Sequence, residues 1–586
     1  MTAPNRNTLW ARTLVSELAA GGVDTVCIAP GSRSTPLTVA FHDHPQIEIL
    51  SFLDERSAGY FALGRGRRTG KPTPVVCTSG TAAANFHPAV MEANEGRVPL
   101  LVLTADRPPE LQDSGANQTT DQTKLYGDAV RWYRTLAEPE AEPRKLRSLR
   151  VTAARAIAES TGTPPGPVHL NVPFRKPLEP THVEGDVPAS LPETAPLAVE
   201  GRDGPFVETS RGTGGPSRED VARLTAAFDA ADRPLVVCGP ANQPTPSREA
   251  LSRFVERTNA PVLADPLSGH RFGPHVESGI CGGYDSYLAD PGLLPEPDLV
   301  VRFGASPTSK TLRKYLADVP ARQFVVDPAG GWREAECTAT DLVTAAPTPL
   351  VDALADQVDE GDRDYREQFE RAERAYWNHV TGACRAEYFE GALLHAVAER
   401  APRPGTIFVS NSMPVRDLDR FGRPQNAELT TLGNRGVSGI DGIVSSGLGA
   451  GSATDDHLVL VLGDLALYHD MNGLLAVDRC DVDATIVLVD NDGGGIFHKL
   501  PIEEFDPPFT EQFRTPHGLD FEPAAGLYDL AFERTQTLDG FTEAFDRAVE
   551  STGTTIVSAE TDSESSHRYR ERLHESALDA IRETLA

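Results

Sequence analysis

Residues 458–495 read LVLVLGDLALYHDMNGLLAVDRCDVDATIVLVDNDGGG, and this stretch decides the fold. Two apolar runs, 458–462 and 485–489, have the length and the branched composition of buried strands. A helix is predicted between them, from about residue 469 to residue 479. A strand, a helix and a second strand of these lengths form one βαβ unit. Its two strands run parallel and end at the same edge of a sheet.

Polar residues follow directly after each of these strands. Gly463 and Asp464 follow the first strand, and Asn491 and Gly493 follow the second. A carboxylate, an amide oxygen and a backbone carbonyl are hard oxygen ligands that suit Mg²⁺, which commonly also holds phosphate groups. Glycines at 493–495 let a diphosphate approach the backbone closely. Either half alone would be ordinary turn sequence, but both halves at this spacing favour a metal-dependent cofactor site.

Apolar runs alternate with helix-like segments along the chain, which is typical of α/β folds with mainly parallel sheets. A length of 586 residues is too great for one core, and we expect three domains, 1–190, 215–365 and 380–586. The other strand candidates are 25–29, 47–52, 74–78, 100–104, 168–172, 235–238, 262–264, 299–303, 324–326, 406–410 and 555–558. We also expect a surface linker over about 178–217 and a solvated helix over 352–374.

The composition argues against several classes of protein. A formal net charge of −30 argues against nucleic-acid or anionic-membrane partners. The apolar runs are only strand-length and the start lacks signal-peptide features, so we expect a cytoplasmic protein. Seven scattered cysteines without a CxxC pair suggest neither a disulfide scaffold nor a zinc site. Only seven of the 55 basic residues are lysine, which favours salt adaptation and a compact state that weakens at low salt.

Arginines occupy loops that follow predicted strands, where α/β folds bind ligands. They are Arg33, Arg107, Arg416 and Arg435. The planar fork of arginine suits carboxylate recognition. In an acidic protein any one of them would simply be a surface ion pair. Four of them in loops bounded by glycine and proline predict a site for several carboxylates.

One glycine-rich segment, 447–451, raises the alternative of a dinucleotide site. It reads GLGAG, which is not the G-x-G-x-x-G fingerprint, and no strand leads directly into it. We therefore expect these glycines to allow close packing of helices.

At this point the sequence resembles a known family, the 2-succinyl-5-enolpyruvyl-6-hydroxy-3-cyclohexene-1-carboxylate (SEPHCHC) synthases, also called the MenD family. The matching strings are APGSRSTPLT from 29, DER from 54, TSGTAAAN from 78, TADRPPEL from 104, GANQ from 115, NRGVSGIDG from 434, GDLALYHDMNGLL from 463 and DNDGGGIFHKLP from 490. Leu465 and Asp490 depart from the general thiamine-diphosphate motif, Gly-Asp-Gly followed by Asn-Asn. The ligand position, Asn491, is retained.

The resemblance implies a fold that binds thiamine diphosphate, and a role for each matching residue. Asp464, Asn491 and the Gly493 carbonyl would hold Mg²⁺ or Mn²⁺ on the diphosphate, beside Gly463. Glu55 would activate the cofactor at N1′ of its aminopyrimidine, and Ile440 would support its bent conformation. Substrate carboxylates and hydroxyls would be bound by Ser32, Arg33, Arg107, Asn117, Gln118, Lys310, Ser412, Arg416 and Arg435, with Phe497 near the reacting carbons. Some members have an arginine after the lysine at 310. Here Thr311 leaves part of the second-substrate contact open.

The activity that the resemblance implies is that of a transferase of menaquinone biosynthesis. It would decarboxylate 2-oxoglutarate and add the resulting carbanion to isochorismate in a 1,4-addition. The family places the cofactor between the first domain of one subunit and the third domain of another, which implies a homodimer or a dimer of dimers. The alternatives are an acetolactate-synthase-like lyase, a non-catalytic protein that kept the fold, and an NAD-dependent dehydrogenase without the dinucleotide fingerprint.

Overall fold

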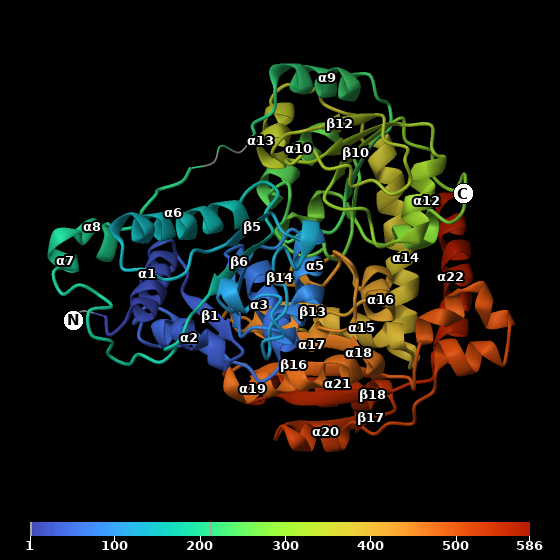
Figure 1. The fold of residues 1–586 in the computed structure, drawn as a ribbon. Helices are drawn as coiled ribbons and strands as arrows, with labels where there is room; N and C mark the ends of the chain where they lie inside the picture. The colour runs from blue at the N-terminus through green and yellow to red at the C-terminus, as the bar shows by residue number, and fades with distance from the viewer. Residues whose placement is uncertain (1–2, 211, 213) are drawn as a thin grey trace. The chain divides into compact units, whose positions relative to one another are not determined.

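A computed structural model describes residues 3–210, 212 and 214–586, and it contains three six-stranded sheets whose paired strands all run parallel (Figure 1). The α/β class is therefore confirmed. The chain forms two compact units. The first is Met1–Arg211, Asn434–Asp455 and Asp470–Val482, and the second is Gly212–Gly433, Asp456–His469 and Asp483–Ala586. No helix in the described part of the chain has the length and apolarity needed to cross a membrane.

The first unit contains a sheet in the order β2-β1-β3-β4-β6-β5. Its strands are β1 (Thr25–Ile28), β2 (Glu48–Ser51), β3 (Thr73–Cys77), β4 (Leu100–Asp106), β5 (Trp132–Thr135) and β6 (Pro167–Pro173). The helices α1 (Arg6–Ala20), α2 (Thr35–His42) and α6 (Pro143–Ser160) share one apolar core with this sheet. The predicted linker contributes to that core, because Leu191 and Ala198 of its short helices α7 (Leu191–Thr194) and α8 (Pro196–Val199) are buried. Residues 211 and 213 of the linker lie outside the described residues.

The glycine-rich segment forms α17 (Ile443–Gly451), which packs against α3 (Glu55–Thr69) within the first unit. A Cβ atom on Gly449 would lie 2.1 Å from the carbonyl oxygen of Phe61, and one on Gly64 would lie 2.0 Å from that of Ser446. Only glycine lets the two backbones come this close. The prediction of close helix packing is confirmed. On its other side α3 packs against α5 (His87–Glu95).

The second unit contains two sheets. One has the order β12-β11-β10-β7-β8-β9, with β7 (Pro234–Cys238), β8 (Val262–Ala264), β9 (Ile280–Cys281), β10 (Leu299–Phe303), β11 (Arg322–Val326) and β12 (Asp341–Val343). One of its faces packs on α9 (Arg218–Asp229), α10 (Arg248–Thr258) and α13 (Pro347–Ala355). A separate core gathers α11 (Tyr284–Tyr287), α12 (Lys310–Asp318), α14 (Asp364–Ala386) and α22 (Ser563–Leu585).

The prediction of one solvated helix over 352–374 is wrong. The segment ends α13, then forms a loop, and then begins α14, whose residues Tyr365 and Phe369 are buried in the core with Trp377. These apolar side chains recur every four or eight residues, so they share one face of the helix. The charged residues that dominate the composition occupy the remaining faces.

The third sheet contains both strands of the predicted βαβ unit, and its strand order is β14-β13-β15-β16-β18-β17. Its strands are β13 (Gly405–Val409), β14 (Leu429–Leu432), β15 (His457–Gly463), β16 (Ala484–Asp490), β17 (Ala531–Thr535) and β18 (Thr555–Glu560). Its core includes α15 (Glu390–Arg400), α16 (Met413–Phe421) and α21 (Leu538–Glu550). Gly463 pairs with Val489, so the two strands end side by side as predicted.

The connection between β15 and β16 differs from the single helix predicted over 469–479. It consists of α18 (Asp464–Asp470), a 3₁₀ segment (Met471–Leu475) and α19 (Ala476–Arg479). Asp470 is fully buried and accepts hydrogen bonds from the backbone N and the Oγ of Ser445, at 2.7 and 3.0 Å. A Cβ atom on Gly473 would lie 2.5 Å from Ser445 Oγ. These contacts with α17 fix the chain where the helix is interrupted.

Candidate cofactor and substrate sites

Asp464 is the first residue of α18 and ties together the ends of β15 and β16. Its Oδ2 accepts hydrogen bonds from the backbone N–H of Gly493, at 2.9 Å, and of Asn491, at 3.2 Å. Burial raises the pKa of Asp464, while the amide of Gly493, the amide of Leu465 and His517 act against that shift. The carboxylate is thus buried at the carboxyl edge of the third sheet, where it organises the loop that follows β16.

Asn491 presents a buried oxygen that no described residue uses. Its Nδ2 donates to Glu390 Oε1 at 2.7 Å, while its Oδ1 has no hydrogen-bond partner within the described chain. Arg570 donates to the other oxygen of Glu390, which fixes that carboxylate. Leaving a buried carbonyl oxygen unpaired is costly, so such an atom calls for a ligand. Glu390 therefore orients Asn491 with its oxygen available to a cation.

Gly493 completes this set of oxygen atoms. Its φ of +132° and the 2.1 Å from an added Cβ atom to the Arg514 carbonyl oxygen exclude any side chain here. Its carbonyl accepts one hydrogen bond, from Gly495 N at 3.0 Å, and keeps a second lone pair. The carboxylate, amide oxygen and carbonyl fit Mg²⁺ or Mn²⁺ by donor type. Among the described residues no three His, Cys, Asp or Glu side chains form a metal cage.

His517 is a neighbour of this site that sequence reasoning missed. Its Nε2 lies 3.3 Å from Asp464 Oδ2. Asp492 holds the loop in place by accepting hydrogen bonds from the backbone N–H of His517 and Gly518, at 2.9 and 2.7 Å. His517 stands in a loop without a recognisable motif, 25 residues after Asp492, so no local pattern could have indicated it.

Five predicted substrate residues gather at the carboxyl edge of the first sheet: Ser32, Arg33, Arg107, Asn117 and Gln118. Arg33 is buried, and its Nη1 donates to the Phe174 carbonyl at 2.7 Å. Arg107 Nη2 donates to the Asn117 carbonyl at 2.8 Å. Burial, and next the charge of Arg107, lower the pKa of Arg33, so the two guanidinium groups are close. The buried Nε atoms of both arginines have no partner among the described residues, which leaves donors for an anion.

Glu55 is the first residue of α3 and is half-buried, after Asp54, which caps the helix by accepting from Arg56 N at 2.9 Å. Burial, and then the charge of Glu55, raise the pKa of the Cys77 thiol, which places Glu55 near the end of β3. Tyr60, from the same helix, donates to Asp441 Oδ2 at 3.0 Å. Because Asp441 directly follows Ile440, this hydrogen bond holds the loop that carries Ile440 against α3.

The loop that carries Arg435 and Ile440 has a second anchor. Glu92 of α5 is almost completely buried and accepts hydrogen bonds from the backbone N–H of Gly436 and Val437, at 2.8 and 2.7 Å. Its charge is balanced by Arg67, at 2.9 Å. Sequence reasoning missed Glu92, because its partners lie 344 and 345 residues further along the chain.

In the second unit, Lys310 and Arg416 line one cavity of about 470 Å³. Ser412, with a positive φ of 68°, precedes α16, and its carbonyl accepts from Arg416 Nη1 at 2.5 Å. Phe497 is half-buried, with its ring centre 5.5 Å from that of Phe513. The predicted residues thus fall into two sets. The first unit has Ser32, Arg33, Glu55, Arg107, Asn117, Gln118, Arg435 and Ile440, and the second has Lys310, Ser412, Arg416, Gly463, Asp464, Asn491, Gly493 and Phe497.

Two family models match the chain. Residues 10–125 match the thiamine pyrophosphate enzyme N-terminal TPP binding domain, and residues 420–559 match the corresponding C-terminal TPP binding domain. Among solved structures, a thiamine diphosphate-dependent 4-hydroxybenzoylformate decarboxylase from Rhodococcus jostii RHA1 superposes with a TM-score of 0.71. It covers 94% of this chain and 99% of its own. Its sequence identity of 19% makes this a likeness of fold alone.

Curated relatives extend over nearly the whole chain. The 2-succinyl-5-enolpyruvyl-6-hydroxy-3-cyclohexene-1-carboxylate synthase of Haloarcula marismortui is 61% identical over 99% of this chain and 100% of its own length. The proteins of the same name from Halobacterium salinarum and Roseiflexus sp. are 59% and 45% identical, each over 98% of this chain and 98% of its own. From this identity over almost every residue, the chain belongs to the 2-succinyl-5-enolpyruvyl-6-hydroxy-3-cyclohexene-1-carboxylate synthase family of thiamine pyrophosphate enzymes.

Proposed function

We propose that this protein is a SEPHCHC synthase of menaquinone biosynthesis. It decarboxylates 2-oxoglutarate and joins the remaining four-carbon unit to isochorismate by 1,4-addition, releasing CO₂. One observation supports this above the others. Cationic side chains lie close together in both units, Arg33 with Arg107 after strands β1 and β4, and Lys310 with Arg416 on helices α12 and α16. Both proposed substrates carry two carboxylates, whereas an acetolactate-synthase-like enzyme needs to hold only the single carboxylate of pyruvate.

Thiamine diphosphate and Mg²⁺ or Mn²⁺ are the proposed cofactors. Asp464, Asn491 Oδ1 and the Gly493 carbonyl would hold the metal, and Gly463 would leave room beside the diphosphate, since an added Cβ atom there meets nothing closer than 3.9 Å. When bound, the cofactor supplies a nucleophilic carbon and a positively charged ring that accepts electrons during decarboxylation.

The residues of the first unit would manage protons and geometry. Glu55 would hold and return the proton at N1′ of the aminopyrimidine, as a general acid and base. Ile440 would support the bent cofactor, because Glu92 and Tyr60 fix the loop on either side of it. A preorganised loop of this kind spares the reaction the cost of ordering it.

The polar residues would orient the two anionic substrates. Arg33, Arg107, Lys310, Arg416 and Arg435 would bind carboxylates, since charged hydrogen bonds discriminate more strongly in a partly dry site than in bulk water. The hydroxyls and remaining carboxylate oxygens would contact Ser32, Asn117, Gln118 and Ser412. Phe497 would pack beside the reacting carbons and exclude water from them.

The proposal extends to domains and assembly. We assign pyrimidine binding to 1–190, a central domain to 215–365 and diphosphate and metal binding to 380–586. The active unit would be a homodimer or a dimer of dimers in the cytoplasm, with no nucleic-acid or membrane partner. The halophilic relatives and the acid-rich, lysine-poor composition support salt adaptation, so assays belong in molar KCl.

The first experiment is a product analysis. The purified protein is incubated in molar KCl with thiamine diphosphate, Mg²⁺, 2-oxoglutarate and isochorismate, and the products are identified by mass spectrometry. An adduct equal to both substrates minus CO₂ supports the synthase. Release of CO₂ without the adduct favours a different acceptor, and therefore another thiamine lyase. A folded protein that binds the cofactor but gives no reaction contradicts the proposal.

Glu390 provides a test of the metal site. In Glu390→Gln the side-chain oxygen will face the charged Arg570, so the NH₂ group will face Asn491. Asn491 then has to turn its own NH₂ toward the metal position. We expect metal affinity to fall about 10–100-fold, as for other residues that orient metal ligands. Titration of cofactor-dependent activity with Mg²⁺ measures the change.

The matched control is Asp417→Asn, because Asp417 also pairs with Arg570 but is not the residue that holds Asn491. Its melting temperature should fall as in Glu390→Gln, while its Mg²⁺ requirement should stay near that of the wild type. Equal Mg²⁺ requirements in the two variants would show that Glu390 acts on stability alone.

A further inference from the structure

The cavity of the second unit gathers an unusual share of the chain's lysines. Three of the seven line it: Lys310 and Lys314 from α12, and Lys499 from the 3₁₀ segment Gly495–Lys499. Within residues 3–210, 212 and 214–586, these three have no ion pair, as is also true of Lys124 and Lys176, whereas Lys71 and Lys145 pair with carboxylates. In a chain with 85 acidic residues, three unpaired lysines around one cavity indicate a site for an anion.

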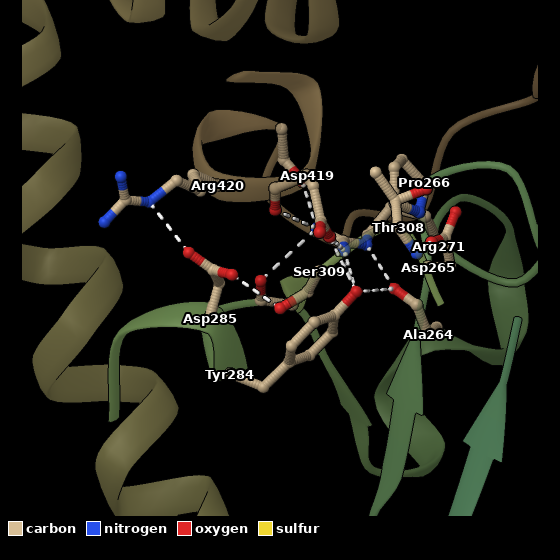
Figure 2. A network of polar contacts seen from close by, with 12 residues as sticks. Ala264, Asp265, Pro266, Arg271, Tyr284, Asp285, Thr308, Ser309, Asp419 and Arg420 are labelled. Atoms are coloured by element: carbon tan, nitrogen blue, oxygen red, sulfur yellow. Dashed lines mark hydrogen bonds and ion pairs between the residues drawn. The ribbon is translucent and has the colours of Figure 1, made fainter. Parts of the chain in front are cut away.

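Two of the carboxylates that line the cavity, Asp285 and Asp419, already form ion pairs, as Figure 2 shows. Asp285 forms an ion pair with Arg420, at 3.1 Å, and Asp419 forms one with the fully buried Arg271, at 2.8 Å. Tyr284 also donates to Asp419, at 2.6 Å. Apart from these pairs, the cavity is lined by three lysines, Lys310, Lys314 and Lys499, and by two carboxylates, Glu296 and Asp318. The balance of charge favours an anionic ligand.

The same network sets the wall of the cavity. Ser309 caps α12 by accepting from Leu312 N at 3.0 Å, and its hydroxyl donates to Asp285 at 2.5 Å. Asp285 in turn pairs with Arg420 of α16. These partly buried polar contacts link α12 to α16, the helices that carry Lys310 and Arg416. Such a site needs little ordering when a ligand binds.

Lys499 reaches this site from a different part of the chain. The charges that act on it include those of Arg416, Arg420, Asp285 and Asp417, which places its ammonium group among the residues just described. Thr311, next to Lys310, lines the cavity without a charge. We propose that Lys499 supplies the charge that Thr311 lacks and binds, with Lys310 and Arg416, a carboxylate of the acceptor, isochorismate. This assignment rests on the proposed function.

Steady-state kinetics of Lys499→Gln test the assignment. We expect the KM for isochorismate to rise about tenfold, because a charged hydrogen bond is lost, while kcat and the KM for 2-oxoglutarate stay within about twofold. The assay runs in molar KCl, where the screening length is about 3 Å, so only direct contacts contribute. The double variant Lys499→Gln with Thr311→Arg should recover most of the loss. Lys145→Gln, an exposed lysine of the first unit, is the control and should behave as the wild type.

Several outcomes overturn the assignment. One is an unchanged KM for isochorismate, and another is a rise confined to 2-oxoglutarate. An equal rise of the KM for isochorismate in Lys314→Gln would show that the total charge of the cavity sets this KM, and not a contact made by Lys499. Wild-type protein that forms no adduct overturns the proposed function and this assignment together. Normal wild-type turnover with an unaffected Lys499→Gln variant overturns the assignment alone.

Discussion

We expect the replacement of Glu55 by glutamine to lower kcat by about 10²–10⁴-fold while thiamine diphosphate still binds, since this is the usual contribution of a general acid–base group. Glutamine keeps the shape of the side chain and its place at the start of α3, but it cannot give or take a proton at N1′. Turnover by product analysis and cofactor binding by calorimetry, both in molar KCl, measure the two effects separately.

The simpler reading of Glu55 is an acidic residue that stabilises a helix start, worth about 0.3–1 kcal/mol. In that case the glutamine variant would lose a little thermal stability and keep its turnover. Asp54→Asn is the matched control, because Asp54 caps the same helix and asparagine caps equally well. We expect this control to retain activity, so a loss confined to Glu55→Gln identifies the proton-transferring residue.

We expect Asp464→Ala to lose the metal-dependent retention of thiamine diphosphate, with affinity lower by at least about 100-fold. The variant removes the proposed metal ligand and also leaves the backbone amides of Asn491 and Gly493 without their acceptor. Calorimetric titration with the cofactor, with Mg²⁺ and with EDTA, measures the difference. Tight binding that still depends on Mg²⁺ would refute the role.

Because Asp464 also organises a loop, the alanine variant could be unstable. Asp464→Asn guards against that explanation, since asparagine can still accept from the two amides but has no charge for the cation. We expect Asp464→Asn to melt near the wild-type temperature and yet to bind the cofactor weakly in Mg²⁺. A variant with wild-type cofactor affinity would show that the carboxylate only shapes the loop.

The sequence predicted the interior strands of each sheet but, with one exception, not the edge strands. The strands that it missed are β5, β9, β12, β14 and β17, and each is the last strand at one end of its sheet. Interior strands are buried on both faces, so they are continuous apolar runs. Edge strands need no such apolar run. For example, β17 reads AFERT, and only its last residue is buried. β2 is the one edge strand that was predicted from its apolar residues.

The candidate site divides in the same physical way. Asp464 and Asn491 were predicted, because strand ends and a fixed spacing are local features of the sequence. Glu390 was not, because it contacts Asn491 from 101 residues away through tertiary packing. His517 and Lys499 likewise carry no motif of their own. A residue that only positions a candidate metal ligand is thus harder to find in a single sequence than the candidate ligand residue itself.

Glu92 has a consequence for the order in which the chain is made. The amides that it binds, those of Gly436 and Val437, are synthesised 344 and 345 residues later. At roughly 5–20 residues per second, that delay is about 17–70 s. During this interval all six strands of the first sheet, which end at Pro173, are synthesised, but the buried carboxylate still lacks two of its hydrogen bonds. The N-terminal unit is therefore finished only after most of the second unit has emerged, and a nascent chain stopped before residue 437 would hold an incomplete first unit.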